Sequence, residues 1–97
     1  MNIKVSQRVL EKLATKHQVQ LKHVEQCFMN REFSFLEDTR EGRGTNPPTL
    51  WFIAETDQLR ELKVVFVGHP DGTIELKSAF PPNDTEKSIY RKRSQER

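Results

Sequence analysis

The chain has a single cysteine, Cys27, among its 97 residues. No disulfide can therefore form within the chain, and no cysteine-based metal cluster can be assembled from it. Proteins of a reducing compartment have such a composition, so we expect this protein in the cytoplasm. Cys27 lies among apolar residues in a helical pattern, which favours a buried, inert thiol over a nucleophile.

Long hydrophobic runs are also lacking. No stretch approaches the ~18 consecutive apolar residues of a membrane span, and the N-terminal segment MNIKVSQRVL lacks the apolar core of a signal peptide. We expect no membrane partner. The hydrophobic fraction is only 34%, yet apolar clusters recur through the middle of the chain. This distribution favours one domain over residues 1–97, with the basic residues 91–97 as a flexible tail.

Glycine and histidine are scarce, with four and three residues. The glycines form neither a phosphate-binding loop nor a dinucleotide fingerprint, so a nucleotide cofactor is not expected. The histidines, at positions 17, 23 and 69, have no spacing typical of a metal site. We therefore predict neither a cofactor nor a metal. The chain has no internal repeat, and its one polar loop is TREGRGTNPP, residues 39–48.

Two helical patterns open the chain. Ser6 is a suitable N-cap for a first helix that ends near His17, with apolar residues on one face at Val9, Leu10, Leu13 and Ala14. A second helix is predicted in HQVQLKHVEQCFMN, where Leu21, Val24 and Phe28 form one stripe. At the other end, Asn83 and Glu86 form a capping box for a third helix after Pro81 and Pro82.

Four strands are predicted between these helices, in FSFLED and over residues 50–54, 62–67 and 74–80. The turn GHPDG joins the last two as an antiparallel hairpin. Trp51 and Phe52 should point to opposite faces of the sheet, because side chains alternate along a strand. The order predicts an α+β fold with two N-terminal helices on one face of a four-stranded antiparallel meander, followed by a C-terminal helix.

Cations supply the candidate site. The net charge is only +2, but basic residues gather near the C-terminal end. Strand alternation can bring Lys63 and Lys77 together with Arg60, with Arg40 and Arg43 of the polar loop, and with Tyr90 and Arg91 of the last helix. Such a cluster suits binding and cleavage of RNA, in which cations stabilise the charged transition state. Solvated surface charge is the alternative interpretation of the same residues.

Several short motifs resemble the BrnT-type toxins of bacterial toxin–antitoxin systems, which have a RelE-like or barnase-like fold. The similarity runs through KHQV (16–19), VEQCFMN, the hairpin LKVVFV…DGTIELKSAF, and NDTEKSIY with Glu86, Ile89 and Tyr90. This chain looks like a divergent branch. Gln18 replaces a glycine that the family usually has, and Phe80 replaces an arginine.

The resemblance implies a metal-independent endoribonuclease that is neutralised by a cognate antitoxin protein. On this hypothesis the catalytic residues are Lys63, Arg60 and Tyr90, and the RNA-binding residues are Arg40, Lys77, Trp51 and Arg91. Trp51 would stack on an unpaired base, whereas His17 fits a structural role at a helix end. Two alternatives stay open: a non-enzymatic protein-binding module with the same fold, and a small hydrolase of the ADP-ribosyl type.

Overall fold

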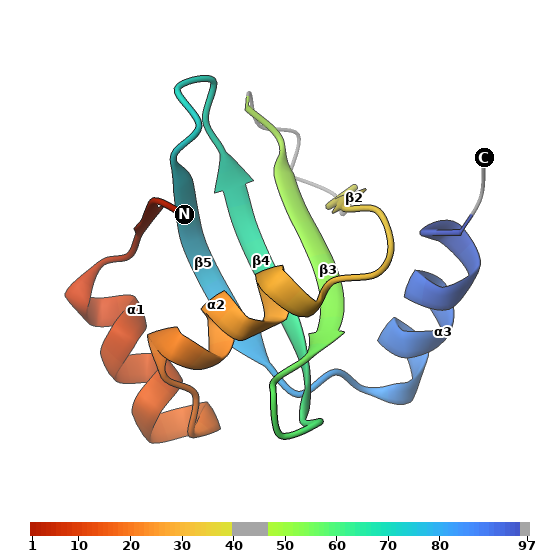
Figure 1. Cartoon of the computed structure of the whole chain (residues 1–97), viewed down its shortest axis with the longest axis horizontal. Helices are drawn as coiled ribbons and strands as arrows, with labels where there is room; N and C mark the ends of the chain where they lie inside the picture. Colours follow the sequence, from red (N-terminus) through yellow and green to blue (C-terminus); the bar gives the residue numbers. More distant parts are fainter. Residues whose placement is uncertain (40–46, 96–97) are drawn as a thin grey trace.

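In the computed structural model, residues 1–39 and 47–95 are described. Figure 1 shows an α+β arrangement, as predicted. The elements are, in order, β1 (Ile3–Lys4), α1 (Gln7–Lys12), the π-helix η1 (Leu13–His17), α2 (Leu21–Asn30), β2 (Leu36–Glu37), β3 (Thr49–Glu55), β4 (Glu61–Gly68), β5 (Ile74–Phe80) and α3 (Asp84–Arg93).

The sheet has five strands in the order β1-β5-β4-β3-β2. Strands β2 to β5 form the predicted antiparallel meander, and β1 is added beside β5 in parallel. The prediction of a purely antiparallel, four-stranded sheet was therefore wrong. β1 has only two residues, too few for a period-two pattern, and it is held by a bond of 2.9 Å from the Ile74 N–H to the Asn2 carbonyl.

The strand predicted in FSFLED is shorter than expected. Only Leu36 and Glu37 pair with β3. Phe35 instead turns its ring into an aromatic cluster, with ring centroids 5.0 Å from Phe66 and 5.4 Å from Phe52. These contacts between aromatic rings take precedence over the alternation of a regular strand.

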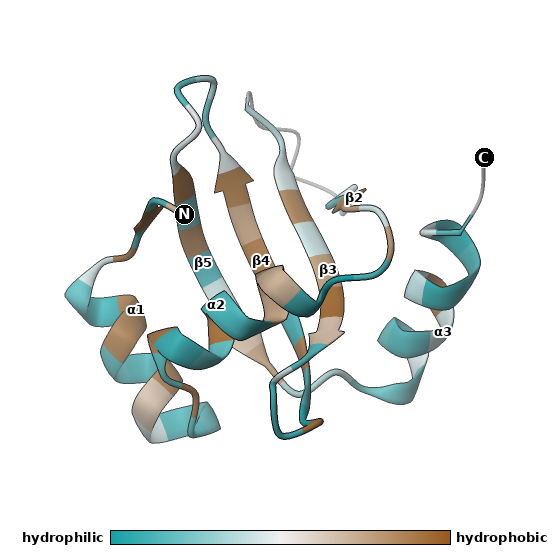
Figure 2. Ribbon diagram, viewed as in Figure 1, coloured by the Kyte–Doolittle hydropathy of each residue, from teal (hydrophilic) through white to brown (hydrophobic). Residues whose placement is uncertain are grey.

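The main core lies between the sheet and the N-terminal helices. Figure 2 shows apolar positions along the central strands, which α1 and α2 cover from one side. Phe52, Leu62 and Val64 are fully buried, together with Val24 and Cys27 of α2. Burial raises the pKa of the Cys27 thiol to about 12, so this cysteine is the inert one that was predicted.

The opposite face of the sheet is covered by α3. Asn83 and Glu86 form the predicted capping box, with bonds of 2.8 and 2.9 Å that fix the start of this helix. Tyr90 then packs on Trp51, with ring centroids 5.6 Å apart. Trp51 and Phe52 thus point to opposite faces, as expected, but the helices of the chain cover both of them.

The first helical segment ends in a strained residue. Ser6 caps α1 by accepting the Val9 N–H at 3.1 Å, as predicted, and the chain continues through η1 to Gln18. Gln18 has φ 53°, in the left-handed region that favours glycine at a helix C-terminus.

Replacing Gln18 by glycine is therefore expected to raise the free energy of unfolding by about 1 kcal/mol, because an L-residue pays for this conformation and glycine does not. Urea denaturation measures the change. Gln20→Gly is the matched control: Gln20 caps α2 with φ −109°, so its loss should lower stability. A destabilised Gln18→Gly would contradict the assignment of strain.

Candidate functional site

Lys63 already has its partners within the structure. Its side chain is 11% exposed, and its Nζ lies 2.7 Å from Oε2 of Glu86. The ammonium also lies 4.5 Å from the centroid of the Trp51 ring and 5.7 Å from that of Phe80. A cation held between a carboxylate and two aromatic faces connects β4 to α3. This placement gives Lys63 a structural role.

Arg60 is bound to the end of the first helical segment. Its guanidinium donates to the carbonyl oxygens of His17, at 2.7 Å, and Gln18, at 2.8 Å. These are orphan acceptors at the end of η1, so Arg60 caps that helix. His17 itself packs on Phe80, with centroids 5.6 Å apart, and burial lowers its pKa, aided by Lys16, Lys12 and Arg60. Arg60 and Lys63 therefore have different hydrogen-bond partners, and each is engaged within the fold.

The remaining predicted residues are also dispersed. Trp51 is 8% exposed beneath α3, and the Tyr90 hydroxyl donates to the Ser34 carbonyl at 3.0 Å. Burial raises the pKa of Tyr90, so its hydroxyl stays protonated. Arg91 is exposed on α3, and Arg40 lies outside the described residues. Lys77, in contrast, faces solvent in a cluster with Glu75 and His69.

Lys77 is placed by an irregularity of β5. Val65 pairs with Ser78 and Phe66 pairs with Leu76, so Lys77 has no register partner on β4. Such a bulge re-aims a side chain. The Lys77 side chain is 48% exposed, and its Nζ donates to Oε2 of Glu75 at 2.6 Å.

Glu75 also reaches across the hairpin to His69. Its Oε1 lies 3.0 Å from Nε2 of His69. The turn that carries His69 is tied by bonds from the His69 N–H to Thr73, at 2.9 Å, and from the Gly72 N–H to His69, at 3.0 Å. Gly72 has φ 89°, a conformation open to glycine. One carboxylate therefore joins an imidazole to an ammonium.

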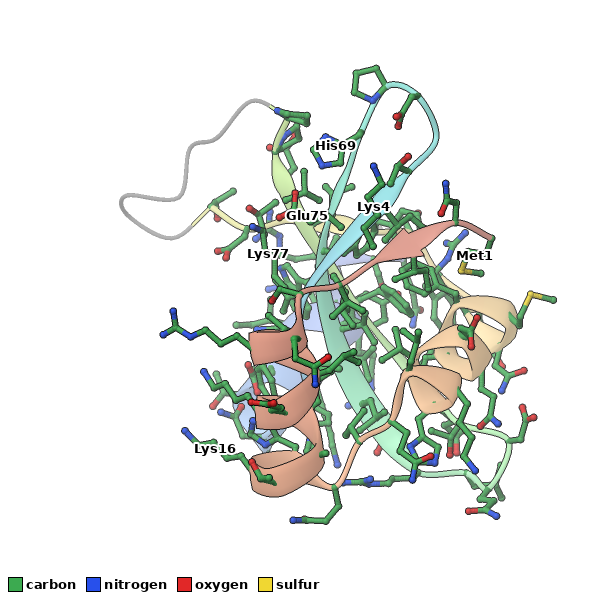
Figure 3. All side chains as sticks on the ribbon, turned by 90° about the vertical axis from the view of Figure 1, so that its left-hand side faces the viewer. Met1, Lys4, Lys16, His69, Glu75 and Lys77 are labelled. Carbon is green, nitrogen blue, oxygen red and sulfur yellow. The ribbon has the colours of Figure 1, made fainter. Side chains whose placement is uncertain are left out.

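Two carboxylates of this hairpin, Glu75 and Asp71, have lowered pKa values. The pKa of Glu75 is lowered, chiefly by its hydrogen bonds from Lys77 and His69. The pKa of Asp71 is lowered by hydrogen bonds from Thr73, with smaller contributions from Lys4 and His69. Lys4 belongs to the same neighbourhood because β1 places it in register with Glu75. Figure 3 shows Lys4, His69, Glu75 and Lys77 on one side of the molecule.

These side chains line a hollow of about 690 Å³ between β1, the start of α1 and the β4–β5 hairpin. We call it the hairpin hollow. Its other lining residues are Val5, Ser6, Val9, Pro70, Asp71 and Leu76. The volume is in the range of small-ligand sites. Two ammonium groups, of Lys4 and Lys77, and two carboxylates, of Asp71 and Glu75, line it, and the ammonium groups can contact an anion. Because Nε2 of His69 faces Glu75, the other ring nitrogen can exchange a proton with a ligand.

The sequence-based set missed three members of this cluster. Glu75 and Lys77 are two residues apart on one strand, and the turn GHPDG brings His69 back toward Glu75. This sequence pattern could have predicted that His69 and Glu75 belong to the same cluster as Lys77. Lys4 carried no such signal, since its place depends on the parallel pairing of β1 with β5. Within residues 1–39 and 47–95, no group of three or more His, Cys, Asp or Glu side chains is arranged to hold a metal ion.

The described helices are all too short or too polar to cross a membrane. Comparisons of the chain with models of protein families, with curated proteins and with solved structures found no match.

Proposed function

We propose that the chain is the toxin component of a toxin–antitoxin pair and cleaves RNA at the hairpin hollow without a metal ion. The observation that carries this proposal is the connected set His69–Glu75–Lys77, in which a single carboxylate contacts the imidazole at 3.0 Å and the ammonium at 2.6 Å. A histidine oriented by a carboxylate is a common arrangement for proton transfer. The resemblance to BrnT-type toxins supports the choice of RNA as substrate.

In the proposed reaction, His69 takes the proton of a 2′-hydroxyl while that oxygen attacks the adjacent phosphorus. The bond from phosphorus to the 5′-oxygen breaks, and the protonated imidazole passes its proton to this leaving oxygen. The products are a 2′,3′-cyclic phosphate and a 5′-hydroxyl end. Every proton and electron pair in this scheme comes from the substrate or from His69, and no step of the scheme uses a metal or cofactor.

The lysines and Glu75 have separate roles in this scheme. Lys77 and Lys4 stabilise the negative charge on the non-bridging oxygens of the phosphorane. A lysine has three N–H donors, so Lys77 can contact both Glu75 and a phosphate oxygen. Glu75 holds the ring of His69 in place through the contact of 3.0 Å with Nε2.

Purified protein incubated with single-stranded RNA in the presence of EDTA tests the proposal. We expect cleavage that EDTA does not inhibit, 2′,3′-cyclic phosphate ends on the products, and a growth defect when the chain is expressed in bacteria. RNA that stays intact at high protein concentration, together with normal growth, would contradict it. RNA that is bound but not cut would favour the non-enzymatic alternative.

A further inference from the structure

A second hollow, of about 660 Å³, lies beside α3. We call it the α3 groove. It is bounded by the end of α2, by the second half of β3 with the turn that follows, and by α3. It has no lining residue in common with the hairpin hollow. Its lining residues are Asn30, Glu32, Phe33, Ile53, Ala54, Glu55, Thr56, Asp57, Leu59, Glu61, Lys87, Tyr90, Arg91 and Gln95.

The floor of the α3 groove is an open strand edge. β2 pairs only with Leu50 and Trp51, so β3 continues beyond its partner toward Glu55. The Asp38 N–H donates to the Thr49 carbonyl at 2.8 Å, which places the odd-numbered residues of β3 with their backbone groups toward this edge. Ile53 and Glu55 therefore direct their backbone N–H and C=O groups into the α3 groove.

Only part of this edge is satisfied within the described residues. Asn30 Nδ2 donates to the Glu55 carbonyl at 3.0 Å, and the Ile53 N–H faces the hydroxyl oxygen of Tyr90. The Ile53 carbonyl and the Glu55 N–H have no partner in the described parts of the chain. In a parallel sheet, one residue donates its N–H to a carbonyl of the neighbouring strand and accepts an N–H from two residues farther along that strand. The Ile53 carbonyl and the Glu55 N–H have this spacing, so one residue of an added parallel strand could pair with both.

The mouth of the groove exposes apolar side chains. Phe33 is 40% exposed and Leu59 is 75% exposed. Leu59 also has φ 66°, a left-handed conformation in the turn between β3 and β4. An exposed leucine in a conformation that glycine would adopt without strain offers an apolar anchor to a ligand.

The charge of the α3 groove is opposite to that of the whole chain. Four carboxylates and two cations line it, an excess of two negative charges, whereas the chain has a net charge of +2. One of those cations, Lys87, is already paired with Glu61 at 3.2 Å. Glu32 and Glu55 are exposed to solvent. The complementary ligand is basic.

We propose that the α3 groove binds an extended peptide segment of a partner protein, in which basic residues alternate with aliphatic ones. The backbone of the segment pairs with Ile53 and Glu55 along β3. Its basic side chains face the carboxylates of the groove, and an aliphatic side chain packs on Leu59 and Phe33. The proposal does not depend on the ribonuclease activity.

A labelled pool of octapeptides, in which Lys or Arg alternates with Val, Ile or Leu, tests this proposal by fluorescence polarisation. A second pool has Glu or Asp in place of the basic residues. We expect saturable binding of the basic pool at least about tenfold tighter than that of the acidic pool. The Glu55 amide should become protected from hydrogen exchange in the complex, because it gains an acceptor.

Two variants separate binding from folding. Glu55→Lys reverses a charge in the groove and should weaken binding about tenfold. Leu59→Gly removes the apolar anchor and relieves the positive φ, so it should weaken binding about threefold or more without lowering the melting temperature. Met29→Ala is the control, since Met29 is 77% exposed and does not line the groove.

Equal affinity of both pools, unchanged binding by both groove variants, or absence of saturable binding would overturn the proposal. So would protection of amides elsewhere with the Glu55 amide unaffected. A dimer that forms through this edge in the absence of peptide would assign the groove to a second copy of the chain, and would also count against a peptide ligand.

Discussion

Replacing His69 by alanine is expected to lower the rate constant for RNA cleavage about 10²- to 10⁴-fold, the range typical of a lost general acid–base group. The physical reason is the position of its ring, held 3.0 Å from Glu75 at the edge of the hairpin hollow. The melting temperature should change little, because His69 lies in an exposed hairpin. Single-turnover kinetics with a short fluorescent RNA measure the effect.

The neighbours of His69 give this prediction its controls. Glu75→Gln keeps the size of the side chain but removes its charge, and should shift the pH profile of cleavage while leaving RNA binding nearly intact. Lys77→Ala should weaken both binding and cleavage. Lys16→Ala is the matched lysine control, since Lys16 lies on the same side of the molecule away from the hollow (Figure 3). Equal cleavage by His69→Ala and the unmodified chain would refute the proposed role.

Replacing Lys63 by alanine is expected to lower the free energy of unfolding by about 3 kcal/mol, because the largely buried carboxylate of Glu86 loses its ammonium partner. Both members of the pair are sheltered, with side-chain exposures of 11% for Lys63 and 20% for Glu86. The contacts with Trp51 and Phe80 would be lost as well. Cleavage per folded molecule should be retained. Chemical denaturation and a cleavage assay on the same sample measure the two effects.

Lys77→Ala is the control for stability. Its partner Glu75 and Lys77 itself are about half-exposed, so this ion pair should contribute less than about 1 kcal/mol. A stable Lys63→Ala that no longer cleaves RNA would reverse the assignment and restore the role that the sequence pattern gave to Lys63. A restored stability in Lys63→Met with Glu86→Gln would support the pair as the source of the loss.

Local patterns predicted much of the fold. Caps at Ser6 and Asn83 fixed the starts of α1 and α3, and the turn GHPDG placed β4 and β5 side by side. What failed depended on tertiary contacts. The parallel pairing of β1 requires residues 71 positions apart to meet, as Ile3 and Ile74 do, and no local pattern encodes it. Phe35 left its predicted strand because an aromatic cluster stabilised its ring elsewhere.

The candidate site was harder to predict, because partners decide what a charge can do. Lys63 and Lys77 have equivalent positions in the sequence pattern, one on each of two neighbouring strands. In the structure Lys63 is buried against Glu86 and Trp51, whereas Lys77 is about half-exposed beside Glu75. Alternation along a strand identifies which face a residue occupies, but not whether a helix covers that face.

The partners of Phe80 bear on the resemblance to BrnT-type toxins in the same way, because they decide what this position can do. It stands where that family usually has an arginine, and here its ring packs on His17 at 5.6 Å and lies 5.7 Å from the Lys63 ammonium. An aromatic ring at this position offers a phosphate neither a charge nor a hydrogen bond. In our proposal the cationic role is taken by Lys77 and Lys4, farther along the same edge.

The most direct test is an NMR titration of the isotopically labelled chain with a single-stranded oligonucleotide that has no 2′-hydroxyl. Such a ligand offers the phosphates but lacks the nucleophile, so it binds without being cut. We predict that the largest shift changes will appear at His69, Glu75, Lys77 and Lys4, and that Arg60 and Lys63 will stay unchanged. Chemical-shift changes centred on Arg60, Lys63 and Tyr90, with no changes in the β4–β5 hairpin, would contradict the account.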